Sequence, residues 1–467
     1  MPLSPQRCAV LVLVAGLPWS LPAEAQTARA TIDAGSILRS VEPGKILGGN
    51  VAAWVAASRL EAPTDDTIRA LGHGVLRFPG GNLSNNYCWT TVRASDNDHV
   101  VWDDWSWGTN VDQYLTFVDH LAVEPMYSLN PFDHTIDGVH HSAVDEAVAL
   151  AREFTSRGYS GAYYEVGNEN EGFWNRMLPV EEYTDRFIAI ADALKREDAS
   201  IRMLGPVGGS YTPEWVDAFI DGLAARNRLH LLDFVAYHFY GGWIAADNSN
   251  GIDLNSPQRI ARETRQVRDR LDALGGVATG IAITEYNAAI WADDTDRAKF
   301  SIEQALWLVD VQGELFRHVD LGNVWITLHT GQDPHSLIDD EAVPPTRTRN
   351  YWPARMVYDT FGSGAPNAPV DVLGTSSDFD SSQLTLHAVR RADSKIGILV
   401  VNKGASAVAL SIALEGSGCA DVTGALLDEP AYQASRGPAA AAVRCSGTTV
   451  AAEIPGRAAI GAVVQPF

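Results

Sequence analysis

Apolar residues recur along most of the chain in two alternating patterns. One pattern is a short run of consecutive apolar residues that ends in polar or acidic residues, as a buried parallel strand does. The other is a set of apolar residues three or four positions apart, which is typical of a helix with one buried face. Runs of the first kind occur at residues 46–54, 75–79, 125–129, 162–166, 201–206, 234–239, 281–284 and 324–328.

Helical spacing fills the segments between these runs. Clear examples are Val144, Val148, Ala151 and Phe154, then Tyr183, Phe187, Ile190 and Leu194, then Ile260, Thr264, Val267, Leu271 and Leu274. Residues typical of helix N-termini support these helices. Ser142 precedes Asp145 in a capping arrangement, and Pro179 precedes two glutamates. The alternation predicts an α/β fold, a (β/α)8 TIM barrel over residues 45–362, whose active site lies at the C-terminal ends of its strands.

The pattern changes after residues 362–364. Val408, Leu410, Ile412 and Leu414 alternate with small or polar residues, and turn residues separate further short runs. We therefore expect a C-terminal β-sandwich over residues 363–467, close to the usual size of about 100 residues. Residues 26–44 contain one more strand-like segment, which can join this sandwich.

The first 25 residues resemble a secretory signal. Arg7 is followed by an apolar run over residues 8–17 and by small residues around Ala25. The run is too short to span a membrane, which takes about 20 apolar residues. We therefore expect a secreted or periplasmic protein.

The net charge of the chain limits the classes of molecule that it can bind. The formal net charge of −23 disfavours nucleic acid and anionic membranes as partners, whereas a neutral polysaccharide or oligosaccharide is compatible with it.

In an oxidising compartment Cys419 and Cys445 can pair, which would stabilise the fold by roughly 3 kcal/mol. Cys88 is then left over as a buried apolar residue. The sequence carries no signal for the oligomeric state.

Two of the apolar runs end in a glutamate. Glu169 follows the fourth run and Glu285 follows the seventh, so a barrel places both on its catalytic face. Glycoside hydrolysis needs such a pair, one carboxyl to protonate the leaving oxygen and the other to attack the anomeric carbon or activate water. A lone glutamate at a strand end is more often structural, but two with amide and aromatic neighbours favour catalysis.

Three motifs carry a family resemblance. Residues 76–82 (LRFPGGN), followed by Tyr87 and Trp89, resemble the strand-two motif of the α-L-arabinofuranosidases of glycoside hydrolase family 51. Residues 166–169 (VGNE) resemble the acid/base motif of that family, and residues 284–287 (TEYN) resemble its nucleophile strand. The layout is shared more distantly with families 44, 39 and 79.

The resemblance implies a retaining enzyme with a role for each motif residue. Glu169 would be the general acid/base and Glu285 the nucleophile. Asn168 would bind the hydroxyl next to the reacting carbon, Tyr240 would hydrogen-bond the nucleophile or the sugar, and Asn82 would be a further sugar ligand. The mechanism requires no metal and no cofactor.

One position departs from the family pattern. Family 51 carries a glutamate on strand one where this chain has Ala52. Asn50 or Trp54 can serve instead, and Trp54 suits stacking against a pyranose face. Two alternatives therefore stay open beside an α-L-arabinofuranosidase. One is an endo- or exo-β-glycanase of glucanase, xylanase or glucuronidase type, and the other is a non-catalytic carbohydrate-binding protein.

Further aromatic and histidine residues are candidates for the binding site. His238 is expected beside the substrate or the nucleophile, and tryptophans at strand ends suit sugar stacking, as do Trp174, Trp243, Trp291 and Trp325. Trp102, Trp105 and Trp107 either bind sugar or pack a long loop onto the barrel. The pairs Asp133-His134 and His140-His141 match no zinc spacing, so no metal site is predicted from them.

Overall fold

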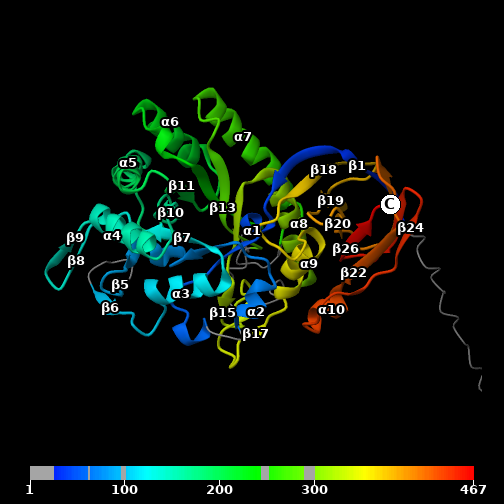
Figure 1. Cartoon of the computed structure of the whole chain (residues 1–467), viewed down its shortest axis with the longest axis horizontal. Helices are drawn as coiled ribbons and strands as arrows, with labels where there is room; N and C mark the ends of the chain where they lie inside the picture. Colours follow the sequence, from blue (N-terminus) through cyan, green and yellow to red (C-terminus); the bar gives the residue numbers. More distant parts are fainter. Residues whose placement is uncertain (1–25, 61–63, 96–100, 243–251, 289–299) are drawn as a thin grey trace, which may run out of the picture.

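Eight parallel strands close into a barrel in the order expected for a (β/α)8 fold. The computed structural model describes residues 26–60, 64–95, 101–242, 252–288 and 300–467, and the ribbon is shown in Figure 1. Around the barrel the strands are β2 (Gly48–Asn50), β3 (Val75–Phe78), β7 (Glu124–Leu129), β10 (Tyr163–Val166), β11 (Arg202–Gly208), β12 (Phe234–Tyr240), β13 (Gly280–Asn287) and β14 (Leu321–Val324). The predicted barrel is thereby confirmed. The expected signal segment, residues 1–25, lies outside the described residues.

Helices cover the outside of the barrel. They are α2 (Thr64–Arg69), α3 (Val111–Leu121), α4 (Ala143–Ser156), α5 (Val180–Glu197), α6 (Ala218–Ala225), α7 (Arg259–Ala273), α8 (Ile302–His318) and α9 (Tyr351–Phe361), with a short α1 (Pro43–Ile46) before β2. The predicted cap of α4 is confirmed, because Ser142 Oγ accepts a hydrogen bond from Asp145 N at 3.3 Å. Helix α8 is buried on nearly all sides because it lies between the barrel and the C-terminal sheet.

The first and eighth barrel strands differ most from their predicted bounds. The first is only Gly48–Asn50, and the eighth is Leu321–Val324 rather than residues 324–328. The apolar run after Val324 has the stronger strand propensity, but pairing with β13 and β2 selects the segment that contains Gly322 and Asn323. Leu328 and His329 instead form β15, which pairs with β16 (Ile338–Asp339) in a small separate sheet together with β17 (Thr346–Arg347).

The loops on the catalytic face carry small elements of their own. After β3 come η2 (Gly81–Asn86) and the sheet of β4 (Tyr87–Cys88), β5 (Arg93–Ser95) and β6 (Trp102–Asp104). After β7 comes a hairpin of β8 (His134–Ile136) and β9 (Val139–His141). These loops place the side chains of the site described below.

The C-terminal part forms a ten-stranded mixed sheet that encloses its own core. It contains β1 (Gln26–Val41), β18 (Val370–Ser377), β19 (Leu384–Arg390), β20 (Ile396–Asn402), β21 (Val408–Glu415), β22 (Asp421–Leu427), β23 (Ala439–Ala440), β24 (Val443–Ser446), β25 (Thr449–Ile454) and β26 (Ala458–Gln465), with α10 (Glu429–Gln433) after β22. Strand β1 lies between β18 and β21, and Figure 1 shows it in blue beside the yellow β18. The alternating residues Val408, Leu410, Ile412 and Leu414 are buried in this core, as expected for a sandwich.

A buried ion group joins the two parts. Asp310 on α8 accepts hydrogen bonds from His387 on β19 at 2.8 Å and pairs with Lys403 at 2.7 Å, and all three side chains are buried. Burial raises the pKa of Asp310, but His387 and Lys403 outweigh this effect and hold the pKa well below its usual value. The barrel and the sheet are thus fixed together by charge as well as by apolar packing.

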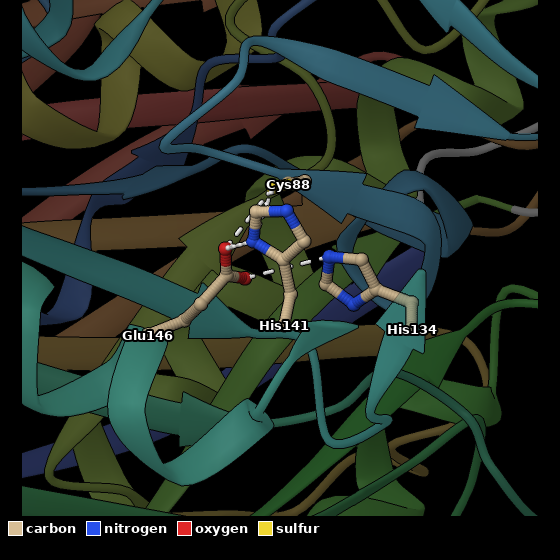
Figure 2. Close-up of side chains that lie close together, drawn as sticks. All are labelled: Cys88, His134, His141 and Glu146. Atoms are coloured by element: carbon tan, nitrogen blue, oxygen red, sulfur yellow. Dashed lines mark hydrogen bonds and ion pairs between the residues drawn. The ribbon is translucent and has the colours of Figure 1, made fainter. Parts of the chain in front are cut away.

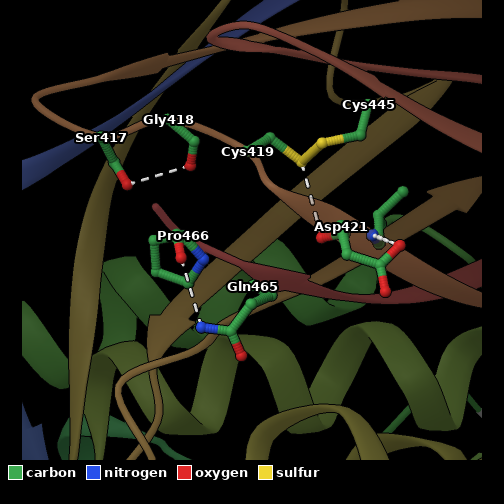
Figure 3. The surroundings of a disulfide bond; sticks show 8 residues. Ser417, Gly418, Cys419, Asp421, Cys445, Gln465 and Pro466 are labelled. Carbon is green, nitrogen blue, oxygen red and sulfur yellow. Dashed lines mark hydrogen bonds between the residues drawn. A yellow bond between two sulfur atoms is a disulfide. The ribbon is translucent and has the colours of Figure 1, made fainter.

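Cys419 and Cys445 form a disulfide in this sheet. Their Cα atoms lie 5.8 Å apart, and the bridge joins the segment before β22 to β24 (Figure 3). Cys88 is the free cysteine of the described residues, and it is buried. None of the described helices is both long and apolar enough to cross a membrane.

Candidate active site

Glu169 and Glu285 meet at the C-terminal ends of β10 and β13. One carboxylate oxygen of each and a ring nitrogen of His238 all lie within 4.8 Å of one another. Glu169 is placed by a sharp turn in which Gly167 has φ of +73°, and a side chain at Gly167 would collide with Asn170. The two predicted catalytic residues therefore do come together.

Arg77 contacts most of the polar groups beneath this pair. Its guanidinium forms an ion pair with Glu165, donates to Glu285 Oε1 at 2.8 Å and donates to Asn168 Oδ1 at 2.8 Å. The side chain is fully buried on β3. Burial lowers the pKa of Arg77, but Glu165 and Glu285 outweigh this effect, so the pKa is raised and the guanidinium stays charged.

Each oxygen of Glu285 is held by its own donor. Arg77 binds Oε1, and the hydroxyl of Tyr240 donates to Oε2 at 2.7 Å. Burial, followed by the negative charges of Glu285 and Glu169, raises the pKa of Tyr240 well above its ordinary value. Tyr240 therefore remains a hydrogen-bond donor, and the carboxylate of Glu285 has a fixed orientation.

Glu169 has a different set of partners. Trp174 Nε1 donates to its Oε2 at 2.7 Å, and His238 Nδ1 lies 2.7 Å from its Oε1. Burial raises the pKa of Glu169, but the hydrogen bond and charge of His238 outweigh it, and the net shift is downward. His238 shows the converse. Burial lowers its pKa, but Glu285 and Glu169 outweigh that effect and raise it.

Side-chain amides hold the turn that presents Glu169. Asn168 Nδ2 and Asn175 Nδ2 both donate to Asn82 Oδ1, at 3.2 and 2.8 Å. Asn85 accepts from Asn168 N at 3.1 Å and donates to Asn168 O at 2.7 Å. The loop after β3 and the turn after β10 are thus one hydrogen-bonded unit.

A cavity of about 880 Å³ opens above the two glutamates. The predicted residues that line it are Trp54, Asn82, Asn168, Glu169, Trp174, His238, Tyr240, Glu285 and Trp325. Asn50 is not among the lining residues. It is fully buried, its amide donates to Thr284 O and Val324 O at 3.1 Å, and its oxygen accepts from Arg77. Asn50 therefore helps to hold Arg77 in place and does not contact the cavity.

Two tryptophans form one wall of the cavity. Trp54 and Trp325 pack edge to face with ring centroids 6.0 Å apart. Within the described part of the chain, the buried Nε1 of Trp54 has no hydrogen-bond partner.

The other predicted tryptophans lie elsewhere. Trp102 is buried and stacks on His134 with centroids 4.5 Å apart, whereas Trp107 is 57% exposed and packs against the partly buried Trp105. These contacts agree with loop packing rather than with a place in the cavity. Trp243 and Trp291 lie outside the described residues.

Sequence reasoning passed over several residues that the site uses. Arg77 and Glu165 interrupt apolar runs, each with an apolar or aromatic residue on both sides. A charge in the middle of a buried strand was the signal that could have identified them, since such a charge needs a partner. Asn85, Asn175, Arg259 and Glu263 also belong to the site or its cavity, and no local pattern distinguishes them.

Among the residues that the structure describes, His, Cys, Asp and Glu side chains lie close together in three places. One group is Glu169, His238 and Glu285, which the proposed chemistry uses directly. A second is Asp310 and His387 with Glu314, at the junction of barrel and sheet, and a third is Cys88, His134, His141 and Glu146.

Comparisons with known proteins agree with the resemblance found in the sequence. No family model matches the chain. The α-L-arabinofuranosidase C of Emericella nidulans is 24% identical over 250 residues, which is 49% of this chain and 49% of that protein. The chain thus spans about half the length of this relative.

Solved structures share the fold over nearly the whole chain. The family 51 α-L-arabinofuranosidase of Thermotoga petrophila RKU-1 has a TM-score of 0.72 at 16% identity, with 94% of this chain and all of that one covered. A family 44 xyloglucanase from Paenibacillus polymyxa has a TM-score of 0.69 at 17% identity and the same coverage. The predicted resemblance to families 51 and 44 is therefore confirmed at the level of fold.

Proposed function

We propose that this protein is a secreted, retaining glycoside hydrolase and that its substrates are α-L-arabinofuranosides. The observation that carries the proposal is the pair Glu169 and Glu285, whose nearest oxygens lie within 4.8 Å of each other at the floor of the cavity. Retaining enzymes keep their carboxyl groups about 5–5.5 Å apart, whereas inverting enzymes need about 6.5–9.5 Å to admit a water.

The two carboxyl groups take different roles because their partners differ. Glu285, oriented by Arg77 and Tyr240, attacks the anomeric carbon and forms a glycosyl-enzyme. Glu169 gives its proton to the leaving oxygen in this first step. In the second step Glu169 takes a proton from the incoming water, and the glycosyl–Glu285 bond breaks.

His238 supplies the proton that Glu169 needs. The raised pKa of His238 and the lowered pKa of Glu169 place one shared proton on the His238 side of their 2.7 Å hydrogen bond before substrate binds. Transfer along this bond leaves neutral His238 and protonated Glu169, which is the form that can act as an acid. When Glu285 becomes glycosylated it loses its charge, and the largest influence that raises the pKa of His238 is removed.

The choice of an arabinofuranoside rests on the relatives. The E. nidulans protein is an α-L-arabinofuranosidase, and it matches about half of this chain. Asn82 and Asn168, which are joined by a hydrogen bond, line the cavity and can present amide groups to sugar hydroxyls.

A β-glycanase is the second candidate. Ala52 is fully buried and offers no carboxylate to a furanose, and the xyloglucanase shares the fold. Trp54 and Trp325 present a wide aromatic wall that suits a pyranose face. A binding protein without turnover is disfavoured, because both carboxylates are present with complete sets of donors.

Secretion is supported by the leader-like residues 1–25 and by the disulfide between Cys419 and Cys445. Structural disulfides form and persist mainly in oxidising compartments. Fractionation of the native host, with Cys419–Cys445 pairing checked by mass spectrometry, tests this part of the proposal. Reduced, cytosolic protein would contradict it.

The decisive experiment compares aryl glycosides. Hydrolysis of α-L-arabinofuranoside, β-xyloside, β-glucoside and β-glucuronide is measured for the wild type, for Glu285→Ala and for Glu181→Ala. Glu181 is an exposed residue on α5 and serves as the matched control. We expect turnover of the arabinofuranoside that Glu285→Ala abolishes and Glu181→Ala keeps. Turnover of a pyranoside alone would select the β-glycanase, and the same rate in Glu285→Ala would reject the site.

A further inference from the structure

Four metal-ligating side chains converge outside the cavity. Cys88 comes from β4, His134 and His141 come from the β8–β9 hairpin, and Glu146 comes from the first turns of α4. Figure 2 shows the dashed contacts that join these four side chains. They originate in three separate segments of the chain, which explains why the spacing along the sequence resembles no zinc motif.

The ligand atoms lie near the separations of a metal site, with Cys88 and His141 against Glu146 Oε1 and His134 against Oε2. Cys88 Sγ is 3.0 Å from Glu146 Oε1 and 3.8 Å from His141 Nδ1, and His134 Nε2 is 3.7 Å from Glu146 Oε2. One ligand atom from each of the four residues fits within 4.8 Å of all the others. Tetrahedral Zn²⁺ with bonds of about 2.0–2.3 Å places its ligand atoms about 3.3–3.7 Å apart.

His134 has an orphaned nitrogen that points to a missing ligand. The side chain is 4% exposed, and in the described structure its Nε2 has no hydrogen-bond partner. Its Nδ1 lies 3.1 Å from the carbonyl oxygen of Phe132 and donates to it. The proton is therefore held on Nδ1, and the lone pair of Nε2 faces Glu146. This pattern, a carbonyl that fixes the tautomer of a ligating histidine, is common around protein metals.

Hydrogen bonds alone do not account for the cluster. Cys88 Sγ and His141 Nδ1 can each donate to Glu146, but His134 Nε2, in the tautomer that Phe132 fixes, has no proton to give. A buried acceptor without a donor is costly, and a cation would bind this lone pair together with the thiolate and the carboxylate.

We propose that Cys88, His134, His141 and Glu146 form a structural zinc site. The donor set of one thiolate, two imidazoles and one carboxylate is one that Zn²⁺ accepts, and four protein ligands leave no open position for catalysis. On binding, the proton of the Cys88 thiol is released to solvent and sulfur bonds to the metal as thiolate. The proton that His141 Nδ1 donates to Glu146 moves to Nε2 by exchange with solvent, so that Nδ1 presents its lone pair.

The ion would connect the elements that frame the active site. Cys88 follows η2, the loop that carries Asn82 and Asn85, while Glu146 lies on the helix after the neighbouring strand. The bond would tie this loop to the β8–β9 hairpin and to α4. It would also keep Cys88 from oxidation and disulfide exchange.

The test uses the full-length purified protein without a histidine tag. Metal is removed with a chelator, and Zn²⁺ or Co²⁺ is then added back. We expect one equivalent of zinc by elemental analysis, and a rise in Tm upon its addition. With Co²⁺ we expect a thiolate-to-cobalt charge-transfer band and the intense visible bands of a tetrahedral site.

Variants assign the ligands. Cys88→Ser and His134→Gln should bind zinc at least about 100-fold more weakly than the wild type, since loss of even an outer partner of a ligand costs about 10–100-fold. His140→Gln changes an exposed neighbour in the same hairpin and should bind like the wild type. Circular dichroism of the metal-free variants checks their folding.

Two results would overturn the proposal. One is wild-type protein that takes up no stoichiometric zinc, and the other is a cobalt spectrum without the thiolate band. Both measurements use the wild type, so they decide the question even if a variant fails to fold. Neither readout depends on glycosidase activity, so failure here and failure of the proposed function are separable.

Discussion

The ring of His238 lies between the carboxyl groups of Glu169 and Glu285 and hydrogen-bonds Glu169, with 2.7 Å between Nδ1 and Oε1. The same nitrogen is 3.5 Å from Glu285 Oε2. The buried Nε2 on the opposite side of the ring has no hydrogen-bond partner within the described structure. Among the described residues, the polar contacts of the imidazole are therefore those that Nδ1 makes with Glu169 and Glu285.

The pH profile should depend on His238. Because the pKa of His238 is raised, the shared proton is retained up to a pH above the ordinary value for histidine, and activity is lost as pH rises through that raised pKa. In His238→Asn the amide N–H can still donate a hydrogen bond to Glu169, but the amide cannot release a proton to it. The alkaline limb of the kcat/KM profile should therefore move to lower pH. A limb that stays in place would contradict the proposal that His238 and Glu169 share a proton.

Removal of the acid/base should depend on the leaving group. In Glu169→Ala, turnover of substrates with poor leaving groups should fall by about 10²–10⁴, because no proton reaches the departing oxygen. The leaving group of a dinitrophenyl glycoside needs little protonation, so the rate of the first step should fall less with this substrate. Added azide should then restore part of the rate and give a glycosyl azide of retained configuration. An azide product of opposite configuration would rule out the retaining mechanism.

Arg77 should be as important for stability as for chemistry. Arg77→Met removes the partner of Glu165 and Glu285 inside the barrel, and breaking such a buried pair costs about 3–5 kcal/mol of unfolding free energy. Adding Glu165→Gln to Arg77→Met should recover part of the lost unfolding free energy, since it removes the buried charge of Glu165 that Arg77 no longer compensates. Urea unfolding of the two single variants and of the double variant measures this coupling, and strictly additive losses would mean that the two side chains act independently.

Glu171 should make the fold less stable as pH rises. Burial raises the pKa of this carboxyl group to about 7, with a smaller contribution from Glu169, although its Oε1 accepts from Gly209 N at 2.5 Å. The folded state therefore binds a proton that the unfolded state has released between about pH 4.5 and 7, and stability falls across that window. Glu171→Gln should be more stable than the wild type by roughly 2–3 kcal/mol at pH 8 and about equal to it at pH 4. Thermal unfolding at the two pH values checks this difference.

The sequence predicted the parts of the site that local pattern encodes. The positions of Glu169 and Glu285 followed from apolar runs that end in polar residues, since the C-terminal ends of barrel strands meet on one face. Trp54, Asn82, His238 and Tyr240 were identified in the same way and by resemblance, and they line the cavity. These predictions needed only the order of residues along each strand.

Contacts between distant segments were beyond such reasoning. The eighth strand was misplaced because pairing with β2 and β13, not propensity, selects Leu321–Val324. Asn50 was expected in the cavity, but its neighbours on β3, β13 and β14 use its whole amide. Cys88 and Glu146 showed no relationship in sequence, and only the packing of β4 against α4 brings them within 3.0 Å.

By itself, then, the sequence determined the barrel, the C-terminal sheet and the two glutamates, because hydrophobic periodicity and strand-end position are properties of neighbouring residues. Tertiary structure alone decided the partners of those glutamates, the role of Arg77 and the cluster around Cys88. Hydrogen bonds and ion pairs act over a few ångströms in space, and residues as far apart in the chain as Arg77 and Glu285 come within that range only when the barrel closes.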